Sequence, residues 1–126
     1  MTAVIYTHSH VDHFGGVRGV VSCDDVASGR VPVLAPEGFV HHAVAENVYA
    51  GAAMSRRAAY MYGAALPVGP GGQMGAGLGM TTSTGTVTLI PPTWDVTHTG
   101  QEETLDGVRI VACSTRATSA PRSPRC

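Results

Sequence analysis

The segment 8–13, His-Ser-His-Val-Asp-His, places three imidazoles and one carboxylate within one short stretch of the chain. Residues 3–6 before it are β-branched and aromatic, as in a buried strand that ends at a functional loop. After it, apolar residues between positions 14 and 21 recur at helical spacing, although glycines weaken this helix. A strand, a ligand-rich loop and a helix are therefore expected in direct succession.

The spacing of these side chains suits a pair of metal ions. In an extended loop, residues two apart point the same way, so His8 and His10 can bind one cation, while Asp12 and His13 reach a second one nearby. Imidazole and carboxylate ligands favour zinc, and they also tolerate iron or manganese. Two such ions lower the pKa of a shared water to about 7 and stabilise charge on a leaving oxygen. The segment thus predicts metal-assisted hydrolysis.

Composition limits the other possibilities. The 126 residues are 44% apolar and 13% charged, which is enough for one domain or part of one. A net charge of -1 provides no positive field for nucleic acid or an anionic membrane. The first apolar run is too short for a signal peptide, and no run is long enough to cross a bilayer. We expect no nucleic-acid partner, no membrane span and, by default, a cytoplasmic location with reduced cysteines.

The remaining pattern alternates between helices and strands. Residues 31–34 are expected to form a second strand. Helical sequence follows over 37–45 and 52–61, with an interruption near Asn47 that leaves either two helices or one broken helix. The glycine-rich stretch 63–85 is expected to be a loop. Short strands then follow, with a hairpin turn at Asp106-Gly107, over residues 86–90, 93–98, 102–105 and 108–111.

Other polar residues are assigned structural roles. His41 and His42 are adjacent on a helix, so they face different directions and cannot chelate one ion together. His98 is isolated among threonines and is expected to be structural. Arg56 and Arg57 could guide an anion, but a charged pair on an alanine-rich helix is more typical of a solvated face.

Several segments of the chain resemble one known family. Residues 7–16 resemble the H-x-H-x-D-H signature of the metallo-β-lactamase superfamily, whose fold has two β-sheets with helices outside. A resemblance to its linear primary alkyl sulfatases runs from Met1 to about Val111, and it is most specific over residues 35–39, 46–48, 54–58, 60–63 and 81–85. The resemblance implies an α/β fold: a partial metallo-β-lactamase αββα sandwich over residues 1–113, incomplete at both ends.

That resemblance also implies an activity. Linear primary alkyl sulfatases hydrolyse small-molecule alkyl sulfates to an alcohol and sulfate at a centre with two Zn²⁺ ions. By this resemblance His8 and His10 would bind one zinc, and Asp12 and His13 the other. The family often adds a dimerisation region, so the resemblance implies a homodimer for a full-length member. Alternatives are a hydrolase of another ester, a thioester or a lactam, and an inactive fragment that binds metal weakly.

The end of the chain departs from the family. Where its members have a Pro-Gly-Thr-Glu-Ala-Pro segment with a zinc-binding glutamate, this chain has Ser119. Residues 114–126 are rich in Arg, Ser and Pro without apolar periodicity, so a disordered, family-divergent tail is expected. A shifted reading frame would produce such a tail. The strands that precede the first one in the family are likewise expected to be missing.

Overall fold

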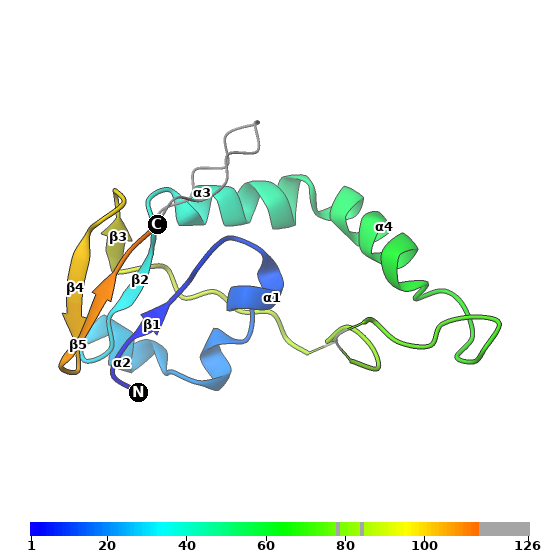
Figure 1. Cartoon of the computed structure of the whole chain (residues 1–126), viewed down its shortest axis with the longest axis horizontal. Coiled ribbons are helices and arrows are strands. Elements are labelled where there is room, and N and C mark those ends of the chain that lie inside the picture. The colour runs from blue at the N-terminus through cyan, green and yellow to red at the C-terminus, as the bar shows by residue number, and fades with distance from the viewer. Residues whose placement is uncertain (78, 84, 114–126) are drawn as a thin grey trace.

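The computed structural model of the chain describes residues 1–77, 79–83 and 85–113. Its strands form two small sheets. Three parallel strands, in the order β1-β2-β3, form the first sheet (Figure 1). A hairpin of two antiparallel strands forms the second sheet. The bounds of the strands are β1 Val4–Ile5, β2 Val33–Pro36, β3 Trp94–Val96, β4 Glu102–Leu105 and β5 Val108–Val111.

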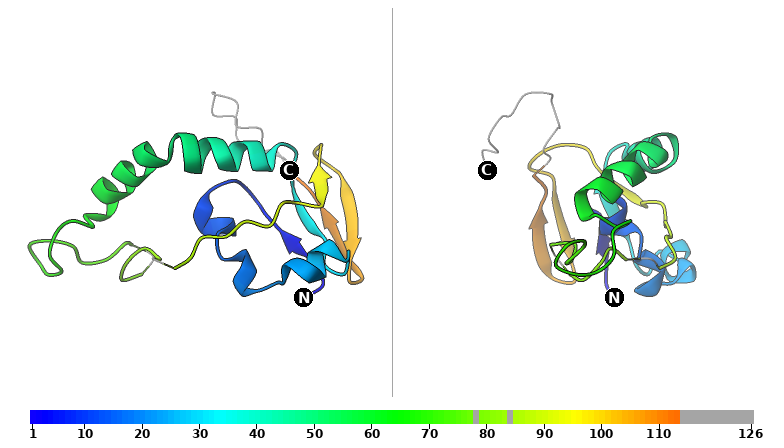
Figure 2. Two further views of the ribbon diagram at one scale, coloured as in Figure 1. Left: turned by 180° about the vertical axis from the view of Figure 1, so that it is seen from behind. Right: turned by 90° about the vertical axis from the view of Figure 1, so that its right-hand side faces the viewer.

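Strand β2 is the centre of the parallel sheet, and both of its faces are covered. Val33 and Ala35 belong to the hydrophobic core that packs under the helices, whereas Leu34 lines an apolar gap of about 280 Å³ between the sheet and the β4–β5 hairpin. Figure 2 shows the hairpin on one side of this sheet and the helices on the other. Burial on both faces explains why the strand is continuously apolar rather than alternating.

Short helical pieces connect β1 to β2. They are α1 Val11–Phe14, the 3₁₀ turn η1 Val17–Gly19 and α2 Cys23–Ala27. The continuous helix expected between positions 14 and 21 is therefore only partly correct, because the chain leaves the α-helical path after Phe14. Gly15 allows this tight turn, since a Cβ there would lie 2.7 Å from the carbonyl oxygen of Val11.

The second helical region confirms the predicted interruption. Helix α3, Phe39–Val44, continues through a π-helical turn, η2 Ala45–Tyr49, into α4 Gly51–Tyr62. The amide of Ala50 donates to the carbonyl of Ala45 at 2.9 Å, five residues back, as a π turn requires. Figure 1 shows the three segments as one bent rod that extends beyond the sheet. No helix of the described residues is long and apolar enough to span a bilayer.

The strand predicted over residues 86–90 is absent. This stretch instead lies against the turn after α1, where the backbone amide and the side-chain hydroxyl of Thr88 both donate to the carbonyl of Gly15, at 2.8 Å and 3.0 Å. These bonds satisfy polar groups that a neighbouring strand would otherwise satisfy. The described part of 63–85 contains no helix and no strand longer than an isolated bridge, as predicted.

The predictions for the last strands are confirmed, although β3 is shorter than expected. Asp106 and Gly107 have φ values of 52° and 77°, the positive values that a two-residue type I′ hairpin needs. The predicted tail, residues 114–126, lies outside the described residues. The domain boundary at residue 113 therefore stays a prediction.

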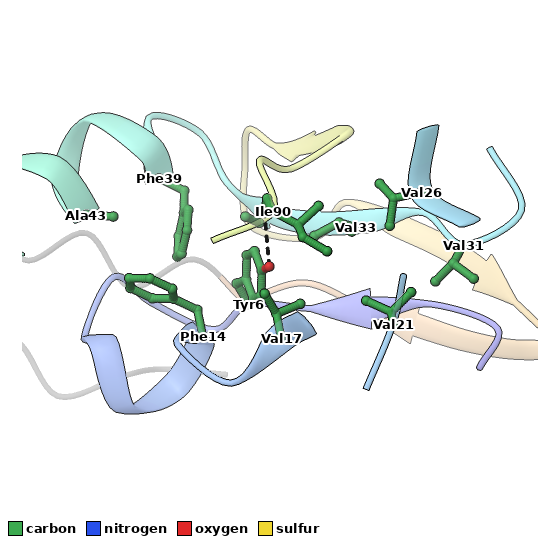
Figure 3. Close-up of a cluster of buried hydrophobic side chains, with 11 residues drawn as sticks. Tyr6, Phe14, Val17, Val21, Val26, Val31, Val33, Phe39, Ala43 and Ile90 are labelled. Carbon is green, nitrogen blue, oxygen red and sulfur yellow. Dashed lines mark hydrogen bonds between the residues drawn. The ribbon is translucent and has the colours of Figure 1, made fainter. Parts of the chain in front are cut away.

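The core is centred on three aromatic rings from three different elements (Figure 3). Tyr6 stacks on Phe39 with ring centroids 4.8 Å apart, and Phe14 packs edge-on against Phe39 at 5.5 Å. The hydroxyl of Tyr6 donates to the carbonyl of Ile90 at 3.1 Å, which satisfies the one polar group of this cluster. Tyr6 and Phe14 directly flank residues 7–13, so the core fixes both ends of that segment. It consists of an extended stretch and the first turn of α1, which contains Asp12 and His13, and it is called the loop 7–13 below.

Replacing Phe39 should therefore destabilise the whole fold. Phe39→Ala removes the ring that Tyr6 and Phe14 share, and large-to-small changes of this kind cost about 3–5 kcal/mol. Denaturant unfolding monitored by circular dichroism measures the loss. Tyr60→Ala is the matched control, because Tyr60 is 90% exposed, and a change there should stay within about 0.5 kcal/mol. Equal effects of the two variants would contradict this description of the core.

Candidate metal centre

The histidines of the loop lie close together at the end of β1. Nε2 of His8 is 3.1 Å from Nδ1 of His10. Two nitrogens bound to one tetrahedral zinc at about 2.0–2.1 Å lie about 3.3 Å apart. The two nitrogens thus already have nearly the separation of a pair of ligands on one ion.

The outer nitrogen of each of these two rings also has a partner. Nδ1 of His8 lies 2.9 Å from Oγ1 of Thr7. Nε2 of His10 lies 3.1 Å from a carboxylate oxygen of Glu46. Because an ionised carboxylate only accepts hydrogen bonds, Nε2 of His10 holds the proton and Nδ1 presents its lone pair to His8.

This tautomer fixes the direction of the neighbouring bonds in the metal-free loop. Nε2–H of His8 donates to Nδ1 of His10, and the hydroxyl of Thr7 donates to Nδ1 of His8. Binding of an ion between the two rings requires His8 to hold its proton on Nδ1 instead. The oxygen of Thr7 can then accept a hydrogen bond from Nδ1–H, since a hydroxyl both donates and accepts.

Asp12 and His13 form a second, more exposed pair. Nε2 of His13 is 3.5 Å from a carboxylate oxygen of Asp12, and their side chains are 48% and 76% exposed respectively. The ring of His13 lies against the ring of His8, with centroids 4.1 Å apart. The structure thus brings all four predicted ligands to one end of the sheet. Their assignment to two separate ions stays a prediction.

Sequence reasoning assigned no role to the two residues that join this loop to the helical rod. Glu46 accepts from the hydroxyl of Ser9 at 3.2 Å in addition to its contact with His10. Asn47 donates to the carbonyl of Ser9 at 3.3 Å and to that of Ala43 at 2.8 Å. The available signal was the predicted helix break, because π turns are frequent at functional sites.

The described residues fit part of a zinc site and do not complete one. Among them, no three His, Cys, Asp or Glu side chains are placed so that they could hold one ion together. Zinc in proteins has three or four protein ligands, whereas the His8–His10 pair supplies two nitrogens at ligand spacing. The type of donor and the spacing of this pair fit zinc, and the number of converging donors is too small for a closed site.

Burial lowers the pKa of His8 below its ordinary value of 6.5, and the neighbouring charges of His13 and His10 lower it further. The neutral imidazole is the form that binds a metal ion. The surroundings of His8 therefore favour the ligand form of this side chain.

Comparison with known proteins agrees with this fold. The model of the metallo-β-lactamase superfamily matches residues 1–112. The chain belongs to the metallo-β-lactamase superfamily, which confirms the resemblance noted in its sequence.

Within that superfamily the chain is similar to alkylsulfatases. It is 65% identical over 108 residues to a linear primary-alkylsulfatase of Pseudomonas sp, covering 86% of this chain and 16% of that enzyme. It is 48% identical over 118 residues to an alkyl/aryl-sulfatase of Saccharomyces cerevisiae, covering 94% and 18%. An (R)-specific secondary-alkylsulfatase of Pseudomonas sp is 44% identical over 122 residues, covering 96% and 18%. The chain thus spans less than a fifth of the length of these relatives.

A solved structure confirms the α/β class and the partial sandwich. The stereoselective inverting sec-alkylsulfatase Pisa1 from Pseudomonas sp. matches 86% of this chain with a TM-score of 0.76 and 46% identity, and the match covers 17% of that enzyme. The fold of this chain therefore matches part of the metallo-β-lactamase fold of that enzyme.

The pKa of His8 predicts how stability depends on pH. The Cε1–H signal of His8 in the metal-free chain should titrate with a midpoint below 6.5 in an NMR pH series. The unfolded chain then binds a proton at this residue more readily than the folded chain, so the free energy of unfolding decreases as pH falls through 6.5. A midpoint at or above 6.5 would contradict the burial and charge environment described for this ring.

Proposed function

We propose that this chain provides the His-rich half of the metal centre of a zinc-dependent alkyl sulfatase that cleaves primary alkyl sulfate esters to an alcohol and sulfate. The observation that supports it most directly is the facing pair of nitrogens on His8 and His10, 3.1 Å apart. The 65% identity to a linear primary-alkylsulfatase supports the substrate class.

The residues of this chain have distinct tasks in the proposed centre. His8 holds one ion through Nε2 and His10 through Nδ1, while Thr7 and Glu46 keep these rings oriented from their outer nitrogens. Asp12 and His13 are proposed as ligands of a second ion. Bound zinc would supply activation of a water and polarisation of the sulfate ester. The further ligands of a complete site have to come from outside the residues that the structure describes.

Two other functions remain distinguishable by assay. The superfamily fold alone is compatible with hydrolysis of another ester, a thioester or a lactam, because fold does not determine chemistry. A chain that binds metal only weakly is favoured by one observation, the small number of donors that converge within the described residues. Both alternatives predict no sulfate release from alkyl sulfates by a site that includes this segment.

The proposal is tested by exchanging this segment into a complete enzyme. The matched 108 residues would replace their counterpart in the Pseudomonas linear primary-alkylsulfatase to which they are 65% identical. Sulfate release from octyl sulfate would then be measured by ion chromatography, with 2-octyl sulfate, a chromogenic lactam and a thioester in parallel. The chimera should release sulfate from the primary ester, and this activity should disappear with a zinc chelator and return with added zinc.

Two matched variants of the chimera test whether its activity depends on the loop histidines. His10→Ala should reduce it by more than about 100-fold, because even residues that only orient metal ligands cost 10–100-fold. His41→Ala, at an exposed histidine of α3, should leave it unchanged. A folded chimera that cleaves the lactam or the thioester but no alkyl sulfate would overturn the proposed substrate class. Equal activity of the two variants would overturn the proposed metal-binding role of the loop.

A further inference from the structure

We propose that Glu46 is a positioning residue of this centre: its carboxylate fixes the ring of His10 so that Nδ1, and not Nε2, faces the ion. The inference rests on the proposed function, in which His10 is a metal ligand. It assigns a task to a residue of the helical rod that lies outside the loop 7–13. Glu46 itself is not proposed to contact the ion or the substrate.

The contacts of Glu46 divide between the two oxygens of its carboxylate. Oε1 lies 3.1 Å from Nε2 of His10, and Oε2 accepts from the hydroxyl of Ser9 at 3.2 Å. The Glu46 side chain is 21% exposed and that of His10 is 56% exposed, so the pair is partly shielded on the carboxylate side. A carboxylate held from both sides in this way has little freedom to leave the ring.

The helical rod provides the geometry that this contact needs. Phe39, Ala43 and Asn47 are four residues apart and lie on one face of the rod. Phe39 and Ala43 are buried in the core on that face, and Asn47 donates to the carbonyl of Ser9 in the loop. The face that packs on the core at Phe39 and Ala43 thus contacts the loop at Asn47, about one turn beyond Ala43.

The π turn lets two adjacent residues contact the same loop. Glu46 contacts the side chains of Ser9 and His10, and Asn47 contacts the backbone of Ser9. In a regular α-helix consecutive side chains point about 100° apart, whereas the wider π turn, Ala45–Tyr49, changes this register locally. Asn47 also donates to the carbonyl of Ala43 at 2.8 Å, which satisfies a carbonyl at the entry to that turn.

A carboxylate on the outer nitrogen has two physical effects on a histidine ligand. It selects the tautomer and orientation of the ring, and its charge raises the basicity of the nitrogen that faces the metal. Loss of such a partner typically lowers metal affinity 10–100-fold. A purely structural tie between loop and helix would give neither effect, because a neutral side chain of the same shape could replace it.

The variant Glu46→Gln separates the effect of the carboxylate charge from the effect of the contacts that Glu46 makes. The amide oxygen of glutamine still accepts from Nε2–H of His10 and its NH₂ group can bond the hydroxyl of Ser9, so the tie between loop and helix is kept and the charge is lost. Zinc affinity of the full chain would be measured by competition with a chromophoric chelator. Glu46→Gln should bind zinc about 10-fold more weakly, and Glu46→Ala up to about 100-fold more weakly. Glu37→Gln, an exposed carboxylate before α3, is the matched control and should match the unaltered chain.

A second readout tests the inference without zinc. Long-range ¹H–¹⁵N NMR spectra of the metal-free chain should show His10 protonated on Nε2, with a ring proton protected from exchange in the unaltered chain and in Glu37→Gln and unprotected in Glu46→Ala. A proton on Nδ1, or unchanged zinc affinity in Glu46→Ala, would overturn the positioning role. If the unaltered chain binds no zinc while His10 shows the Nε2 proton, the proposed metal site of this chain fails and the orienting contact of Glu46 stands.

Discussion

The packing of Tyr6 and Phe14 on the single ring of Phe39 is the constraint on which the candidate centre depends. Tyr6 directly follows the first strand and Phe14 ends the first helix, so the segment between them has both of its ends in the core. Polar loops lose backbone and side-chain entropy when they are ordered. Here the apolar anchors on either side offset that cost, and His10 and His13 can remain exposed at the surface.

Much of this arrangement could be predicted because it depends on local sequence. A β-branched strand, a ligand-rich loop and the Asp106-Gly107 hairpin follow from periodicity and from backbone preferences of single residues. The resemblance to alkylsulfatases added the superfamily and the fold. The prediction of a strand over 86–90 was wrong because the alternating pattern is equally compatible with an extended segment that pairs with no strand. Its partner is the turn at Gly15, a contact 73 residues away in sequence.

The contacts of the loop could not be predicted for the same reason. Sequence placed Glu46 and Asn47 beside a helix interruption, but not opposite Ser9, which is 37 residues from Glu46 in the chain. Their position depends on where the helical rod crosses the end of β1, and that crossing is set by Phe39 and Ala43 in the core. Long-range contacts of this kind follow from packing, on which a single sequence gives little information.

The hydrogen-bond relay explains how the loop can hold this geometry before an ion is present. Clustered imidazoles without partners would be costly, and three positive charges would repel each other. In the metal-free chain each ring nitrogen between Thr7 and Glu46 has a hydrogen-bond partner, and the lowered pKa of His8 favours the neutral form of that ring. An ion that enters between the rings replaces the His8–His10 bond and leaves both outer bonds in place. The order of the loop is then set by protein contacts, and the metal adds to it.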